Sequence, residues 1–208
     1  MKTFIKSLLY GIVFILSSKA DGQPKSSLFH NSGIYTSLQW MAGEDILITP
    51  QVWTYADDFY LEGRLNYEDR RTVSLFCGKS FLAGKNEEWE IIPMVGGICG
   101  QFQGIAPALT CLHKSKWLKG FSQSEFAVSI IENGKNFFFN WTGITTPLLS
   151  NSGIGISWRW IALPNFSPAI DKGVMFSVQK KPFTIEGFAY NFWQDGFILA
   201  LGLEFDLK

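Results

Sequence analysis

In the stretch FILALGLEFDL, residues 197–207, two kinds of side chain alternate. Each odd-numbered residue is a phenylalanine or a leucine, and from Ala200 onward each even-numbered residue is small or acidic. Successive side chains of a β-strand point to opposite faces, so this period of two predicts a strand with one greasy and one polar face. The same alternation recurs in residues 58–67, 154–160 and 174–179. We therefore expect an all-β chain.

Short segments rich in Gly, Asn, Asp and Pro interrupt these runs, as is typical of turns. They divide the chain into about twelve strands, or ten if the division of residues 34–55 into two strands fails and one pair is lost. Either number is even, as an antiparallel barrel with both termini on one side requires. We expect short turns on both sides. The expected strand centres are Gln39, Gln51, Gly63, Leu75, Met94, Leu109, Phe126, Phe139, Ser157, Phe176, Gly187 and Leu201.

Alternation alone does not distinguish a transmembrane barrel, whose apolar face contacts lipid, from a soluble β-sandwich, whose apolar face is buried in a hydrophobic core. Many runs have about 10 residues, the length that a tilted strand needs to cross a membrane. The opposite face is small and polar, which suits a narrow wet lumen. Aromatic side chains also gather beside the turns, and their rings favour the lipid headgroup level. These aromatic residues are Trp40, Trp53, Tyr55, Phe59, Tyr67, Trp89, Trp117, Phe137, Trp160 and Trp193.

The start of the chain has the features of a cleaved signal peptide over residues 1–20. It has a basic start, an apolar run over residues 8–16 and small residues before a cut after Ala20. That run is too short for a transmembrane helix, which needs about 20 residues. Residues 21–31 are a polar lead-in expected in the periplasm, and residues 32–208 are expected to form one barrel in the outer membrane of a Gram-negative bacterium.

Charge excludes one class of partner. The 18 basic and 18 acidic residues cancel, and cleavage after Ala20 would remove three lysines and no acid. The mature chain would then be mildly acidic, without the basic footprint of a protein that binds nucleic acid.

The sequence carries no convincing catalytic or metal-binding pattern. Cys77, Cys99 and Cys111 lack close ligand spacing and predict no disulfide framework. His30 and His113 are isolated. No nucleophile elbow, zinc motif or phosphate loop is present. We therefore expect no cofactor, no metal and no enzymatic activity.

Charged residues on the polar faces form the candidate functional site. A twelve-stranded barrel is wider than the eight-stranded kind that side chains fill, and narrower than an open 16-stranded porin. The charges either pair and fill the interior or line a constriction that selects small solutes by sign. In the second case we expect Glu62 and Arg64 to set the ionic preference. The lumen candidates are Glu62, Arg64, Arg159, Glu186 and Glu204, with Glu90 as a further one.

Two features lie outside this set. The turn over residues 68–71, Glu-Asp-Arg-Arg, is expected to be solvated. The last strand carries the glycine and hydrophobic spacing, Gly202, Phe205 and Leu207, of a terminal strand that the barrel-insertion machinery reads. Lys208 departs from that pattern, since an aromatic residue is more usual there.

The stretch FYLEGRLNYED at 59–69, with PMVGG at 93–97 and GIAP at 104–107, resembles the uncharacterised small outer-membrane β-barrel proteins of Bacteroidetes-type bacteria. FFNW at 138–141 adds a weaker similarity. The resemblance covers about residues 50–145 by motif and the rest by pattern. It implies a single outer-membrane barrel and brings no substrate and no catalytic residues.

The expected function is a narrow pore or small-molecule transport channel. A closed structural or accessory barrel that docks on an envelope complex is the alternative from another class. An envelope-lipid enzyme with His113 as its base, and a soluble secreted β protein, are the remaining alternatives. The expected partners are outer-membrane lipid, the barrel-insertion machinery and, for the accessory barrel, an envelope complex.

Overall fold

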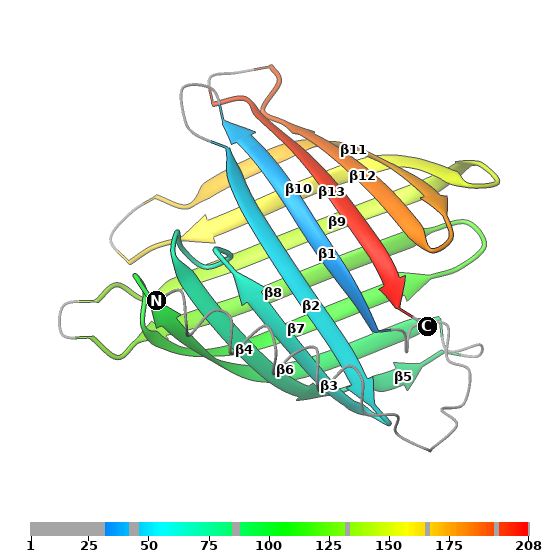
Figure 1. Ribbon diagram of the computed structural model, residues 1–208. Coiled ribbons are helices and arrows are strands. Elements are labelled where there is room, and N and C mark those ends of the chain that lie inside the picture. The colour runs from blue at the N-terminus through cyan, green and yellow to red at the C-terminus, as the bar shows by residue number, and fades with distance from the viewer. Residues whose placement is uncertain are drawn as a thin grey trace.

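The computed structural model describes residues 32–41, 46–84, 88–131, 134–164, 167–193 and 196–207. The expected signal peptide and lead-in, with His30, lie outside these residues. The described part is made of strands joined by short turns (Figure 1). The strands are β1 (Ser32–Met41), β2 (Leu47–Ala56), β3 (Phe59–Leu65), β4 (Thr72–Lys79), β5 (Phe81–Ala83), β6 (Trp89–Gly100), β7 (Gly104–Lys114), β8 (Lys119–Ser129), β9 (Phe137–Leu149), β10 (Ser152–Ala162), β11 (Ala169–Lys180), β12 (Phe183–Tyr190) and β13 (Ile198–Leu207).

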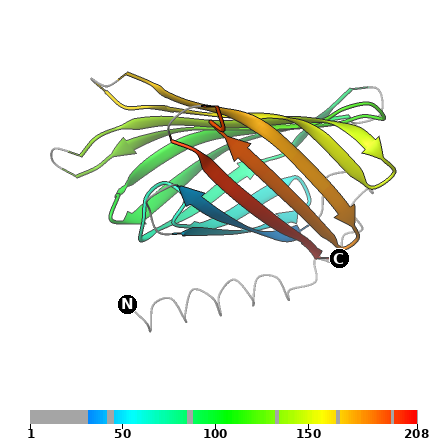
Figure 2. The ribbon, with the colours of Figure 1, turned by 90° about the horizontal axis from the view of Figure 1, so that it is seen from above.

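Twelve of these strands form a closed antiparallel barrel. Each pairs with its neighbours in sequence, β13 pairs with β1, and β4 pairs with β6 across the short β5. The strands on opposite sides of the barrel cross one another in projection, as strands tilted to a common axis do (Figures 1 and 2). All twelve predicted centres lie inside these twelve strands, and the ten-strand alternative is wrong. The sequence analysis missed β5, which extends the β6 edge where we expected only a turn.

The apolar faces of the strands point outward. Leu199, Leu201 and Leu203 of β13 are 49%, 46% and 47% exposed, whereas Ile198 and Ala200 between them are each 6% exposed. A β-sandwich would bury the leucines, so this arrangement excludes the sandwich and confirms the barrel. Among the described residues, no helix has the length and apolar character to cross a bilayer.

The aromatic side chains divide between the two faces, which corrects part of the sequence analysis. Trp40, Phe59, Trp89, Trp117, Trp160 and Trp193 are exposed on the outside, as expected. Four others lie inside: Trp53, Tyr55 and Phe137 pack against a buried cluster, and Tyr67 lines a cavity. Trp53 and Tyr55 share the strand parity of the buried Gln51, so the pleat turns them inward.

The barrel interior is more apolar than its sequence pattern indicated. One buried cluster contains Tyr60, Phe76, Ile92, Met94, Ile98, Ala106 and Ala127, and another contains Met175, Phe188, Tyr190, Ile198 and Ala200. The side chains of these two clusters therefore fill part of the lumen and leave only the rest of it open.

Inside the barrel, aromatic rings lie over glycines of the next strand. Phe76 is paired with Gly96 and Phe121 with Gly143, and a Cβ at either glycine would collide with the ring. A glycine with an aromatic side chain across the strands is a recognised device for pinning the register of curved sheets. The glycines of β6 and β9 thus hold the rings that shape the lumen.

Replacing Gly96 with valine should lower the free energy of unfolding by about 1–3 kcal/mol, the usual cost of an overpacked core. The new side chain would displace the fully buried ring of Phe76. Gly97 is the matched control, because it is the next residue of β6 and a Cβ there meets no atom within 4 Å. Urea unfolding in lipid vesicles measures both variants, and equal losses from Gly96→Val and Gly97→Val would contradict the packing argument.

Candidate functional site

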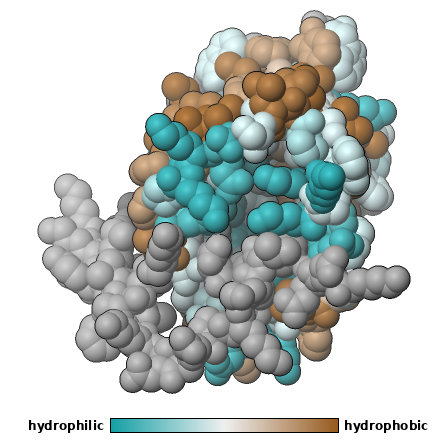
Figure 3. All heavy atoms as spheres, turned by 90° about the vertical axis from the view of Figure 1, so that its right-hand side faces the viewer, coloured by the Kyte–Doolittle hydropathy of each residue, from teal (hydrophilic) through white to brown (hydrophobic). Residues whose placement is uncertain are grey.

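Two cavities enter the barrel from opposite ends. The distal cavity, at the end away from the described chain termini, has a volume of about 900 Å³. The proximal cavity, at the end where β1 begins and β13 finishes, has a volume of about 620 Å³. Figure 3 looks onto the proximal end, where hydrophilic side chains gather within the rim and hydrophobic ones cover the outside above them.

The two cavities meet at a waist formed by Tyr35 of β1 and Trp141 of β9, which line both. Their ring centroids are 6.3 Å apart. The Trp141 ring also packs edge-on against Phe121 and Phe188, at centroid distances of 4.9 Å and 5.3 Å. Its Nε1 donates hydrogen bonds to Ser157 Oγ at 3.2 Å and Tyr190 Oη at 2.9 Å. Trp141 is thus fixed by contacts from several strands at the narrow part of the lumen.

An ion cluster around Arg64 fills the barrel beside the waist. Arg64 Nε lies 2.8 Å from Glu62 Oε1, and Nη1 lies 2.7 Å from Glu125 Oε2 and 3.7 Å from Glu68 Oε1. The guanidinium also lies over the rings of Phe76 and Tyr67, at 4.0 Å and 4.6 Å from their centroids. Three carboxylates therefore surround one buried arginine.

Burial distinguishes this cluster from an exposed ion selector. Arg64 and Glu62 are each 2% exposed, and Tyr60 Oη donates to Glu62 Oε2 at 2.9 Å. A charge that is desolvated and paired in this way stabilises the interior rather than meeting a passing ion. The role of Glu62 and Arg64 in ionic preference stays a prediction, and the geometry favours pairing.

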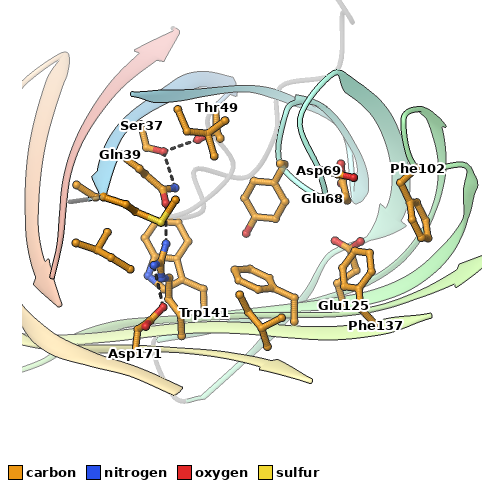
Figure 4. Close-up of a pocket in the computed structure, with 18 of the residues that line it drawn as sticks. Ser37, Gln39, Thr49, Glu68, Asp69, Phe102, Glu125, Phe137, Trp141 and Asp171 are labelled. Atoms are coloured by element: carbon orange, nitrogen blue, oxygen red, sulfur yellow. Dashed lines mark hydrogen bonds and ion pairs between the residues drawn. The ribbon is translucent and has the colours of Figure 1, made fainter. Parts of the chain in front are cut away.

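The turn at residues 68–71 is not simply solvated, contrary to the sequence analysis. The Glu68 side chain folds into the lumen with no exposed surface and accepts a hydrogen bond from Ser74 Oγ at 2.6 Å. Burial raises the pKa of the Glu68 carboxyl, and the nearby Arg64 charge opposes that rise. Figure 4 shows Glu68, Asp69 and Glu125 together on one side of the distal cavity. Arg64 Nη1 lies 3.7 Å from Glu68 Oε1 and so supplies a positive charge to this buried turn residue.

Arg159 holds the other side of the distal cavity. Its Nη2 lies 2.9 Å from Asp171 Oδ2, and its Nη1 donates to Gln39 Oε1 at 2.7 Å. Asn191 Nδ2 donates to Asp171 Oδ1 at 2.7 Å. These bonds tie β10 and β11 to β1 across the cavity (Figure 4).

The remaining sequence candidates lie nearer the proximal end. Glu186 of β12 and Glu204 of β13 line the proximal cavity. Glu90 of β6 is fully buried and accepts a hydrogen bond from Ser80 Oγ at 2.5 Å. The five principal candidates therefore divide into the Arg64 cluster, the Arg159 pair and the Glu186–Glu204 pair.

Sequence reasoning missed four side chains that shape the lumen, namely Tyr35, Glu125, Trp141 and Asp171. Glu125 had a usable signal, because the polar Gln123 and Glu125 share one face of β8. Trp141 had none, since it follows three phenylalanines and an asparagine, a run without clear alternation. Within the described residues, no group of three or more His, Cys, Asp and Glu side chains is arranged to hold a metal ion.

The fold is similar to that of solved porins. The NanC porin matches with a TM-score of 0.61 at 9% sequence identity, over 84% of this chain and 99% of that one. The KdgM porin, in complex with disordered oligogalacturonate, matches with a TM-score of 0.55 at 13% identity, over 85% of this chain and 99% of that one. No family model matches the chain, and no curated protein matches it. At such low identities the likeness shows a common barrel fold.

Proposed function

We propose that this chain is an outer-membrane channel that lets small solutes cross through a narrow lumen. The observation that carries the proposal is the pair of cavities that enter from opposite ends and share Tyr35 and Trp141 at the waist. A lumen lined by polar groups at both ends and narrowed by side chains is the arrangement from which pores derive their selectivity. The porin fold of the structural neighbours supports the same function.

The outer surface supports a place in a membrane. Soluble monomers rarely expose contiguous apolar patches larger than a few hundred Å². Here leucine, isoleucine, valine and phenylalanine side chains are exposed on strands around the barrel, including Leu38, Leu75, Val95, Ile156 and Phe176. A closed barrel also satisfies its backbone hydrogen bonds internally, as a hydrocarbon environment requires. The exposed tryptophans at strand ends suit the headgroup level.

We further propose that residues 1–20 act as a cleaved signal and that residues 21–31 lie in the periplasm. The insertion machinery reads the β13 spacing, and the chain is related to the small barrels of Bacteroidetes-type bacteria. No catalytic role is proposed, because the ring of His113 stacks on Trp89 at a centroid distance of 4.3 Å, a contact that suits packing.

A closed accessory barrel that docks on an envelope complex is the second candidate function. The specific observation in its favour is that the Arg64 cluster and two apolar clusters occupy much of the lumen. The two functions differ in one measurable property, namely whether ions cross the folded barrel.

Single-channel recording in planar bilayers tests the proposed function. Protein that migrates as a folded barrel on a gel until it is boiled should give discrete current steps. The reason is that the two cavities, which meet at the waist, form a water-filled path through the barrel. Boiled protein is the control and should give none. Silence from demonstrably folded protein would contradict the channel and favour the accessory barrel, whose partners should then co-purify in mild detergent.

A further inference from the structure

Glu186 and Glu204 lie side by side in the proximal cavity. Glu186 of β12 is paired with Gly202 of β13, and Glu204 lies two residues further along β13. Residues two apart on a strand share a face, so both carboxylates point into the same part of the lumen. Asp206 continues this row toward the proximal rim and also lines the cavity.

These carboxylates differ from those of the Arg64 cluster in having no ion-pair partner among the described residues. Neither Glu186 nor Glu204 makes a hydrogen bond or ion pair with another described residue, whereas Glu62 and Glu125 each contact Arg64. Glu186 and Glu204 repel each other, and Glu204 is also repelled by Asp206, while Lys119 attracts both glutamates. Like charges in a confined space repel, so they favour the arrival of a positive charge.

The nearest positive groups stand at the mouth of the cavity. Lys114 ends β7 and Lys119 begins β8. Both interact electrostatically with Glu204, and Lys119 interacts with Glu186 as well. Lys119 Nζ donates to Gln179 Oε1 at 3.3 Å, and its side chain is exposed. Glu186 is three residues inside β12, roughly 10 Å along the strand at the usual rise per residue. The lysines therefore reduce the negative potential of the two glutamates without forming an ion pair with either of them, and Lys119 Nζ is held by Gln179.

Tyr35 supplies an independent sign of a ligand. It is 7% exposed, and its hydroxyl has no hydrogen-bond partner among the described residues. A Cβ at Gly202 would collide with this hydroxyl, which therefore lies over Gly202, the cross-strand partner of Glu186 and two residues from Glu204. A buried hydroxyl without a partner is costly unless another molecule or ion satisfies it. Its oxygen is available to a cation that the two carboxylates attract.

We propose that Glu186, Glu204 and the Tyr35 hydroxyl form a cation-selecting site, which holds a small monovalent cation such as K⁺ on its way through the barrel. This inference rests on the proposed channel function and names the residues that select its solutes. Carboxylate and hydroxyl oxygens are hard ligands that suit hard cations. In this proposal the ionic preference depends on Glu186 and Glu204 rather than on Glu62 and Arg64. An acidic oligosaccharide of the kind bound by the KdgM porin would meet repulsion here.

The reversal potential in a KCl gradient tests the assignment. Glu186→Gln combined with Glu204→Gln keeps side-chain shape and removes both charges. The ratio of K⁺ to Cl⁻ permeability should fall at least about fivefold, because a single unit charge a few ångströms from the ion path in a wet lumen already accounts for that factor. Asp57→Asn with Asp58→Asn is the matched control, because these two carboxylates are exposed at the same end of the barrel. An unchanged ratio in the glutamate variant, with normal current steps, would overturn the site and leave the channel standing.

A second measurement does not depend on an open lumen. If bound K⁺ relieves the repulsion between Glu186 and Glu204, the unfolding temperature of the detergent-solubilised wild type should rise more steeply with KCl than that of the double glutamine variant. Tyr35→Phe, which removes only the hydroxyl, should weaken the same dependence, and the Asp57→Asn/Asp58→Asn control should keep it. A silent barrel with this K⁺ dependence would retain the site and lose the channel. Identical salt dependence in all variants would refute the site.

Discussion

Replacing Arg64 with alanine should lower the free energy of unfolding by about 3–5 kcal/mol, the usual cost of removing one partner from a buried ion cluster. The substitution would leave Glu62, Glu68 and Glu125 facing one another without a counter-charge. It would also remove the guanidinium that packs on the rings of Phe76 and Tyr67. Urea unfolding in lipid vesicles, followed by tryptophan fluorescence, measures the loss.

Two comparisons separate charge from lost volume. Arg159→Ala is the matched control. Its side chain is 12% exposed, and its removal leaves a single carboxylate without its cation, Asp171, which keeps the hydrogen bond from Asn191. We expect a clearly smaller loss there. In the Arg64→Ala background, Glu125→Gln should restore part of the stability because it removes one of the three carboxylates left without a counter-charge. If the double variant is as unstable as Arg64→Ala alone, the cost comes from the cavity, and the electrostatic account is wrong.

The three carboxylates around Arg64 also change the expected effect of reversing the Arg64 charge. If Arg64 set the ionic preference, Arg64→Glu would change the cation-over-anion permeability of the channel. With three carboxylates already around this position, a fourth would be buried among them. We expect that variant to fail to fold rather than to conduct with altered selectivity, which a gel-shift assay for the folded barrel would reveal.

The strands were predictable because their signal is local. Each strand repeats apolar and polar side chains with a period of two, so its position and its two faces can be read from about 10 consecutive residues. In β3, for example, Tyr60, Glu62 and Arg64 alternate with Phe59, Leu61 and Leu65, and the structure buries the first set. The alternation in β2 also predicts that Trp53 and Tyr55 point inward, because they follow Gln51 on the same face of the strand.

The contacts across the lumen were not predictable in the same way. Arg64 and Glu125 are 61 residues apart, and they meet only because β3 and β8 face one another inside the closed barrel. Which side chains meet across the interior depends on strand tilt and stagger, which no single strand encodes. For the same reason the sequence identified Glu186 and Glu204 as lumen residues and did not reveal that they lack the partner that Glu62 has.

Replacing Trp141 with alanine should raise the single-channel conductance several-fold. Trp141 and Tyr35 are shared by both cavities, so the indole occupies the place where the path through the barrel is narrow. Its Nε1 bonds to Ser157 and Tyr190 and its ring contacts with Phe121 and Phe188 hold it there. Removing the indole widens the connection between the distal and proximal cavities, and conductance rises when a hydrophobic constriction is relieved.

Trp160→Ala is the control that makes this result specific to the waist. Trp160 is 42% exposed and packs on Phe138 at a centroid distance of 5.3 Å, on the outer face. Its loss removes the same side chain without touching the lumen, so its conductance should equal that of the wild type. Equal conductance in Trp141→Ala and the wild type would place the current-limiting point elsewhere, and the Arg64 cluster would then be the next position to open. A silent wild type with a conducting Trp141→Ala variant would mean that the indole closes the barrel, and it would favour the closed accessory barrel over the channel.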